Sequence, residues 1–200
     1  MYVPDKIYLD CGAHFGEGLE SYIEKYSIDN SWKVLSFEPN IVSFKELIKN
    51  NKIKINVDFI NKAVWTYDGN ITFNAEYPPG SEVSDGAGSS IIDLEYWKPK
   101  SDNNPGAGDV FNSYEIECVD ISKLILDNFK VEDIIILKMD IEGAEFDVLR
   151  KMISDGSIKY INDIYVEFHD FCYHKETGEN KTNLILEIKE ANKEINIYGN

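Results

Sequence analysis

The sequence has few cysteines, no long apolar run and a shortage of positive charge, and each absence excludes a class of protein. Cys11, Cys118 and Cys172 are an odd number without metal-ligand spacing, so we expect buried thiols rather than a disulfide framework. No run of 18 apolar residues is present, and the first residues lack the charged and then apolar layout of a signal peptide. We therefore expect a soluble, cytoplasmic protein.

Basic residues are outnumbered in this chain. Its 20 Lys and Arg face 36 Asp and Glu, and the formal net charge is -16. Such a molecule repels phosphate backbones and anionic lipid surfaces, so we expect neither nucleic acid nor a membrane as a partner. At 200 residues and 43% hydrophobic composition the chain can bury one sizeable core, which predicts a single domain over residues 1–200.

Apolar runs of strand length alternate with helical patterns along most of the chain. The runs predicted as strands are Lys6–Leu9, Lys33–Phe37, Val57–Ile60, Ile134–Met139 and Ile161–Phe168. The helical patterns between several of them fall within Leu19–Tyr26, Ile41–Ile48, Ile121–Phe129 and Phe146–Ile153. Continuously apolar strands are typical of a parallel sheet that is covered on both faces. The pattern therefore predicts an α/β fold with a doubly wound, mostly parallel sheet.

Two segments interrupt this alternation, and the end of the chain is short. In AVWTYDGNITFNAEY, two strand-like runs flank Asp68-Gly69, which predicts a β-hairpin after the third strand. The long segment 78–109 is rich in Gly, Pro, Ser, Asp and Asn, which predicts a lid or substrate loop, with disorder as the alternative. After residue 170 we expect one helix near Leu184–Ile188 and one short strand in INIYG, which makes an abbreviated sheet edge.

A glycine-bearing turn follows the first strand, in LDCGAHFGEGL. In open α/β sheets ligands bind beyond the carboxyl ends of the strands, and a glycine in the first loop lets the backbone approach the ligand. The dinucleotide fingerprint G-x-G-x-x-G needs its second glycine where this chain has His14. Asp10, two positions before Gly12, would repel a phosphate and attract a cation. These features favour S-adenosylmethionine, a sulfonium without phosphate, over a dinucleotide; the alternative is a helix-capping loop with glycine for packing.

Glu38 ends the second apolar run, in VLSFEPN. An acidic residue about 20 positions after the glycine turn can accept hydrogen bonds from both hydroxyls of a ribose. Pro39 then starts the next helix, where its missing N–H is harmless. Since a dinucleotide would use Glu38 in the same way, this residue indicates a nucleoside ligand without choosing between the two. The alternative is a solvated carboxylate stabilised by the helix macrodipole.

Charged side chains follow the two later strands. In IIILKMDIEGAEFDVL, Lys138, Asp140 and Glu142 occupy alternate positions, so a continuing strand would point all three to one side. Such charges are costly unless they bind something or form an ion pair of Lys138 with one of the carboxylates. One strand later, IYVEFHDF brings Glu167 and His169 to the same edge. A substrate hydroxyl could lose its proton there.

Six segments together resemble the FkbM-type family of S-adenosylmethionine-dependent methyltransferases. They are LDCGAHFGEGL, SFEPN, NKAV, GSSI, LKMDIEGAEFDVL and VEFHD. The segments occur in the family's order between Ile7 and Asp170, and K-x-D-I-E-G-A-E is the most specific of them. The resemblance implies one methyltransferase-like domain with the class I, Rossmann-like fold, and O-methylation of a sugar, glycan or other small molecule. His14 departs from the family pattern, in which Asn usually follows G-A.

The resemblance also implies roles for individual residues. The residues that would bind the methyl donor are Asp10, Gly12, Ala13, His14, Gly16, Glu38, Pro39, Ala63 and Asp140. Among these, Glu38 would hold the ribose and Ala63 would contact the adenine region through its backbone. The residues that would face the transferring methyl group are Asp140, Glu142 and His169.

Three questions about the chemistry stay open at the level of sequence. For the general base we favour His169, because the unperturbed imidazole pKa is near 6.5 and neighbouring carboxylates favour the protonated form; Asp140 is the second choice. The favoured prediction has no metal, but in a metal-assisted version Asp140, Glu142 and either His169 or Asp170 would hold Mg²⁺. A non-catalytic nucleoside-binding module is the remaining alternative.

Overall fold

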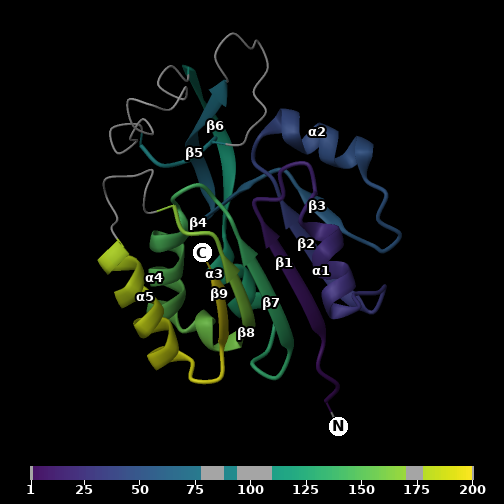
Figure 1. The fold of residues 1–200 in the computed structure, drawn as a ribbon, viewed down its shortest axis with the longest axis vertical. Coiled ribbons are helices and arrows are strands. Elements are labelled where there is room, and N and C mark those ends of the chain that lie inside the picture. The colour runs from purple at the N-terminus through teal and green to yellow at the C-terminus, as the bar shows by residue number, and fades with distance from the viewer. Residues whose placement is uncertain (1, 78–87, 94–109, 170–177, 200) are drawn as a thin grey trace.

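The structure is a computed structural model of the 200-residue chain and describes residues 2–77, 88–93, 110–169 and 178–199. Its main feature is a six-stranded sheet with the order β3-β2-β1-β7-β8-β9 (Figure 1). The strands are β1 (Lys6–Cys11), β2 (Trp32–Phe37), β3 (Asp58–Ile60), β7 (Ile134–Met139), β8 (Ile161–Val166) and β9 (Asn196–Gly199). Neighbouring strands of this sheet all pair in parallel, which confirms the predicted doubly wound α/β class.

Helices cover both faces of the sheet. They are α1 (Leu19–Tyr26), α2 (Ile41–Asn50), α3 (Ile121–Asn128), α4 (Glu145–Asp155) and α5 (Gly178–Ala191), with a short 3₁₀ helix, η2 (Ser157–Tyr160). Figure 1 shows α4 and α5 on one side of the sheet and α1 on the other. Alternate residues of β1 divide between the two layers: Leu9 belongs to the cluster that contains Leu149 of α4, and Tyr8 belongs to the cluster packed against Tyr22 of α1. The predicted helices are confirmed, except that α2 begins at Ile41 with Asn40 as its N-cap, so Pro39 does not start it.

Polar side chains fix where several helices begin and end. Asn40 accepts the Val42 N–H at 2.9 Å at the start of α2, and Asp120 accepts the Lys123 N–H at 3.0 Å at the start of α3. Gly156 ends α4 in the left-handed conformation with φ of 83°. These capping residues fix where the helices of the βα units begin and end.

A second sheet of three strands follows β3. It consists of β4 (Ala63–Trp65), β5 (Gly69–Tyr77) and β6 (Val110–Asp120), in the order β4-β6-β5. The two predicted strands form, but their pairing as a hairpin is wrong, because β6 lies between them, parallel to β4 and antiparallel to β5. Asp68 explains the difference: it accepts the Asp120 N–H at 3.0 Å and pairs with Lys123 at 2.9 Å. These contacts tie the Asp68-Gly69 turn to the end of β6.

The remaining expectations concern the long loop and the carboxyl-terminal edge. Only residues 88–93 of the segment 78–109 belong to the described part, and there Ser90 forms an antiparallel bridge with Asn74 of β5. The predicted final helix and strand are confirmed as α5 and β9, so the sheet has the abbreviated edge. Cys11 and Cys118 are buried free thiols, and Cys172 lies outside the described residues.

None of the helices that the structure describes has both the length and the hydrophobicity that a membrane span requires.

Candidate active site

The site lies where the direction of the strand order reverses. From β1 the sheet continues to β2 on one side and to β7 on the other, so the loops that follow β1 and β7 diverge. Such a switch point leaves a crevice beyond the carboxyl ends of the strands. Gly12 forms its base with φ of 83°, and a Cβ atom there would lie 1.8 Å from the backbone oxygen of Asp140. Only glycine permits this close approach of the two loops.

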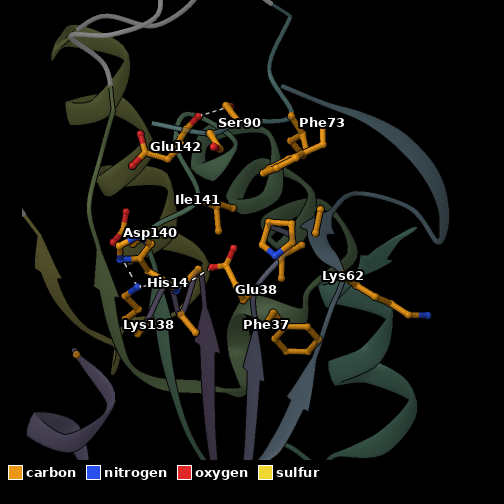
Figure 2. Close-up of a pocket in the computed structure, with 18 of the residues that line it drawn as sticks. His14, Phe37, Glu38, Lys62, Phe73, Ser90, Lys138, Asp140, Ile141 and Glu142 are labelled. Atoms are coloured by element: carbon orange, nitrogen blue, oxygen red, sulfur yellow. Dashed lines mark hydrogen bonds and ion pairs between the residues drawn. The ribbon is translucent and has the colours of Figure 1, made fainter. Parts of the chain in front are cut away.

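A cavity of about 320 Å³, which we call the donor cavity, opens at this point. Six short stretches and Phe73 line it. The stretches are 12–14, 17–18, 37–39, 62–64, 89–91 and 138–142, the last without Met139. Figure 2 shows Glu38 in the middle of these residues, with Asp140 and Lys138 to one side. Of the residues predicted to bind the methyl donor, those that line the cavity are Gly12, Ala13, His14, Glu38, Pro39, Ala63 and Asp140.

Glu38 is buried, with 5% exposure, and its carboxylate is fixed by the backbone. Its Oε2 accepts the His14 N–H at 2.7 Å, and its Oε1 accepts the Asn40 N–H at 2.8 Å. His14 adopts the left-handed conformation, with φ of 51°, at the position where the dinucleotide fingerprint has its second glycine. Burial raises the pKa of Glu38 to about 7, against the lowering effect of the two N–H groups.

Asp10 and Gly16 are predicted donor-binding residues that the structure places outside the cavity wall. Asp10 is 3% exposed and accepts a hydrogen bond from Ser36 at 3.0 Å, and the cation it faces is Lys138 of its own chain, at 3.8 Å. Gly16 has φ of 89°, and a Cβ atom there would lie 2.7 Å from Leu47 of α2. Gly16 therefore serves the packing of the turn against α2.

Lys138 connects the turn after β1 with the end of β7. Its Nζ donates to the Gly12 carbonyl at 2.5 Å and pairs with Asp140 Oδ2 at 3.3 Å. Burial alone would lower the pKa of Lys138, but the carboxylates of Asp10 and Asp140 outweigh burial and raise it. The ion pair between Lys138 and Asp140, which the sequence offered as an alternative to a binding site, is thus present, and both residues also line the cavity.

Glu142 does not continue the alternation predicted for this segment. The strand ends at Met139, and Glu142 and Gly143 have φ of 53° and 98°. This turn directs Glu142 away from Lys138 and towards His169, whose Nε2 lies 3.4 Å from Glu142 Oε2. The strand on which that expectation depended ends before Glu142, because left-handed backbone replaces it, yet Lys138, Asp140 and Glu142 all line the donor cavity.

Asp140, Glu142 and His169 form what we call the carboxylate–imidazole cluster. His169 Nε2 lies 3.8 Å from Asp140 Oδ1, and one ligand atom from each residue falls within 4.8 Å of the others. Burial alone would lower the pKa of His169, but Glu145, Glu142 and Asp140 raise it to about 9, the predicted direction. Burial raises the pKa of Glu142 to about 8, and His169 opposes this rise.

Glu145 is a site residue to which the sequence analysis assigned no role. It is fully buried, and its carboxylate accepts the N–H groups of Ile141 at 2.9 Å and Gly143 at 3.0 Å. It also contacts His169 Nδ1 at 2.9 Å. Because a carboxylate accepts, Nδ1 carries the proton in this contact, and Nε2 faces the two cluster carboxylates. An acidic residue in the first turn of a helix was the available signal.

His169 itself lies behind the donor cavity. It is 5% exposed and is not among the lining residues, whereas Asp140 and Glu142 both line the cavity. The structure therefore brings the three predicted catalytic residues together but exposes only the carboxylates. Asp170, the other predicted metal ligand, lies outside the described residues.

Part of the cavity wall comes from the second sheet, for which no role was predicted, and from 88–93, which falls within the segment predicted as a lid or substrate loop. Ser89, Ser90 and Ile91 line the cavity together with Phe73 of β5. Ser90 Oγ donates to the Glu142 carbonyl at 2.5 Å, which joins this wall to the carboxylate–imidazole cluster. The segment GSSI was the sequence signal that could have identified this wall. Its side chains reach the cavity only because the segment pairs with β5, which is distant in the sequence.

A family model and a solved structure match this chain. The family model described as Methyltransferase FkbM domain matches residues 10–195. Among solved structures, the chain is similar to the methyltransferase FkbM from Methylobacillus flagellatus KT, with 14% identity and a TM-score of 0.47. That match covers 96% of this chain but 39% of the other, so this chain spans about two fifths of that protein's length. The comparison with curated proteins gives no match.

Proposed function

The chain belongs to the FkbM methyltransferase family, and on that premise we propose that it transfers a methyl group from S-adenosylmethionine to a hydroxyl of a sugar or another small molecule. The observation that carries this proposal is the buried carboxylate of Glu38, held by two backbone N–H groups beside a cavity at the switch point. A fixed acceptor in this place suits the two hydroxyls of a ribose.

The donor cavity has the size and charge that this ligand requires. A volume of about 320 Å³ is within the range of roughly 300–1,000 Å³ that small-molecule sites occupy. With the ribose at Glu38, the adenine would lie towards Ala63 and Phe73, and the sulfonium towards Gly12 and Asp140. Carboxylates on this wall favour a cationic sulfonium and disfavour the pyrophosphate of a dinucleotide.

The reaction is an in-line displacement. A bond forms between the acceptor oxygen and the methyl carbon, the carbon–sulfur bond breaks with its electrons on sulfur, and a base takes the hydroxyl proton. We assign the base to Asp140, the second choice from sequence, because its side chain is 32% exposed at the cavity, against 6% for His169. His169 then acts as a positioning residue, held by Glu145 and directed at Asp140.

The first test is calorimetry of ligand binding. The protein should bind S-adenosylmethionine and S-adenosylhomocysteine, and Glu38→Gln should weaken both by at least about tenfold, because a charged acceptor is lost. Glu46→Gln, at an exposed position of the neighbouring helix α2, is the matched control and should leave affinity unchanged. Tight binding of NAD without binding of either sulfur ligand would overturn the proposal.

Metal-assisted methyl transfer is a second candidate, favoured by the geometry of the carboxylate–imidazole cluster. Its three ligand atoms lie within 4.8 Å of one another, and Glu145 orients the imidazole from behind, as carboxylates do for metal-bound histidines. Two oxygens and one nitrogen suit Mn²⁺ or Fe²⁺ better than Mg²⁺, the metal of the metal-assisted alternative in the sequence analysis. Titration with Mn²⁺, followed by its electron spin resonance, should show one site that His169→Gln removes; without such a site, the metal-free route stands.

A further inference from the structure

A second cavity, of about 210 Å³, lies at the carboxyl ends of β7, β8 and β9. The lining residues that matter here are Tyr22, Tyr165, Tyr198, Glu167, Lys138 and Asp140. Lys138 and Asp140 line the donor cavity as well, so they form a wall common to both cavities. A molecule in this second cavity would therefore have Asp140, the residue assigned as the base, within its reach.

Three tyrosine rings give this cavity an aromatic surface. Tyr165 of β8 and Tyr198 of β9 are partners in the parallel register, and their rings stack with centroids 4.6 Å apart and planes 8° apart. Tyr22 of α1 meets Tyr165 edge to face at 4.9 Å. The residues come from three elements far apart in the sequence, and the fold alone brings their rings to one place.

Contacts around Tyr165 fix this surface before any ligand arrives. The hydroxyl groups of Tyr165 and Tyr26 share a hydrogen bond of 2.6 Å, and the Tyr26 hydroxyl also contacts Asp163 Oδ2 at 2.7 Å. The Lys25 ammonium lies 4.4 Å from the Tyr165 ring centroid and 5.0 Å from that of Tyr198. A recognition surface held by such contacts loses little conformational freedom on binding.

The polar groups of the second cavity disfavour an anionic ligand. Glu167 and Asp140 supply carboxylate oxygens, while the one lysine on the wall, Lys138, is already within 4 Å of two carboxylates and donates to the Gly12 carbonyl. Such a wall accepts hydrogen bonds from hydroxyls and repels phosphates and carboxylates. Its volume is below the roughly 300–1,000 Å³ of drug-sized sites, which suits a ligand that buries a single ring.

We propose that this tyrosine-lined cavity is the acceptor site and that it holds an uncharged, saturated ring with several hydroxyls, the chemistry of a single sugar residue. The apolar face of the ring would pack against Tyr198, the more exposed member of the stacked pair, Glu167 would accept from one hydroxyl, and the hydroxyl to be methylated would lie at Asp140. This inference rests on the proposed function, because it places the acceptor beside the methyl end of the donor.

Saturation-transfer difference NMR on the protein saturated with S-adenosylhomocysteine tests the site. Methyl α-glucopyranoside and methyl α-rhamnopyranoside are the uncharged rings, glucose 6-phosphate is the anionic ring, and catechol is the flat aromatic. The two glycosides should receive magnetisation at their ring protons, and glucose 6-phosphate should receive at least about tenfold less. Binding of catechol or of the phosphate alone would overturn the class of ligand.

Variants connect the signal to the tyrosines. Tyr198→Ala and, independently, Glu167→Gln should each weaken glycoside binding about tenfold, which corresponds to about 1.4 kcal/mol, and leave the affinity for S-adenosylhomocysteine unchanged. Tyr67→Ala is the matched control, because Tyr67 is 45% exposed, like Tyr198 at 44%, and lines neither cavity. Unchanged glycoside signals in both site variants, or no glycoside binding while S-adenosylhomocysteine binds, would refute the site. If S-adenosylhomocysteine itself did not bind, the proposed function would fail instead.

Discussion

At the scale of single residues, the turn after β1 is shaped by contacts that its sequence only partly reveals. The placement of Gly12 and Glu38 at the cavity could be predicted, because a glycine turn and an acidic residue that follow successive strands have local signatures. The burial of Asp10 and of His169 could not, since each depends on a partner from another element, Lys138 of β7 for the first and Glu145 of α4 for the second. The sequence thus names the groups at this edge, and tertiary contacts decide which of them face the ligand.

A first prediction concerns Gly12. Gly12→Ala should lower the free energy of unfolding by about 2 kcal/mol or more. The substitution places a Cβ atom against the Asp140 carbonyl, and it also holds a residue other than glycine in left-handed backbone. Gly156→Ala is the control, since Gly156 has the same φ of 83° but no atom within 4 Å of the added Cβ. Urea denaturation of both variants separates the steric clash of the added Cβ atom from the backbone strain. Equal losses of stability in the two variants would show that Gly12 and Asp140 do not approach each other closely.

A second prediction concerns the protonation of His169. Its pKa of about 9 lies above the unfolded value near 6.5, so the stability that its proton confers is fully present below pH 6.5. That contribution is lost as the pH rises through 9. The stability difference between wild type and His169→Gln should therefore shrink between pH 6 and pH 9.5, by an amount on the order of 1–3 kcal/mol. A difference that stays constant with pH would mean that the imidazole is neutral in the folded protein.

At the scale of elements, the parallel sheet was predictable and the second sheet was not. Continuous apolar runs such as Ile134–Met139 carry a strong local signal, whereas in β6 the polar residues Glu115 and Glu117 alternate with less polar ones on a half-exposed strand. The insertion of β6 between β4 and β5 depends on Asp120 meeting Asp68 across 52 residues, which no local pattern encodes. Pairing with β5 of this sheet places 88–93 at the donor cavity. The site predicted from sequence therefore did not include this part of the cavity wall.

A third prediction tests this wall. Asn74 of β5 is buried, donates to the Ile92 carbonyl at 2.9 Å and accepts from Ser113 at 2.6 Å. Asn74→Ala should leave the carbonyl of the buried Ile92 without this donor, cost about 1–3 kcal/mol of stability and weaken S-adenosylhomocysteine binding several-fold. Thr72→Ala, at an exposed position of the same strand, should change neither quantity measurably. Undiminished affinity in folded Asn74→Ala, measured by calorimetry, would show that 88–93 is not a wall of the donor site.

At the scale of the whole molecule, charge is the dominant property. A formal net charge of -16 produces a negative potential around the protein, and the carboxylates at the sheet edge add to it locally. Such a field favours a cationic donor over its neutral product, since S-adenosylmethionine carries one more positive charge than S-adenosylhomocysteine. In the sequence analysis the negative charge argued against nucleic acid as a partner. In the proposed reaction the same charge favours binding of the donor over its product.

A fourth prediction follows from this field. Raising ionic strength from about 0.01 M to 1 M shortens the Debye length from roughly 30 Å to 3 Å. The ratio of the affinities for S-adenosylmethionine and S-adenosylhomocysteine should therefore fall with added NaCl, and the affinity for the neutral product should change little. Parallel calorimetric titrations at the two salt concentrations measure this ratio; a ratio that does not respond to salt would remove the electrostatic argument.

The most direct measurement is a crystal structure of the protein with S-adenosylhomocysteine. The account predicts that both ribose hydroxyls lie within hydrogen-bonding distance of Glu38, that the sulfur faces Asp140, and that the tyrosine-lined cavity opens next to that sulfur. A nucleoside bound elsewhere on the protein, or bound here with its sulfur turned away from Asp140, would contradict it.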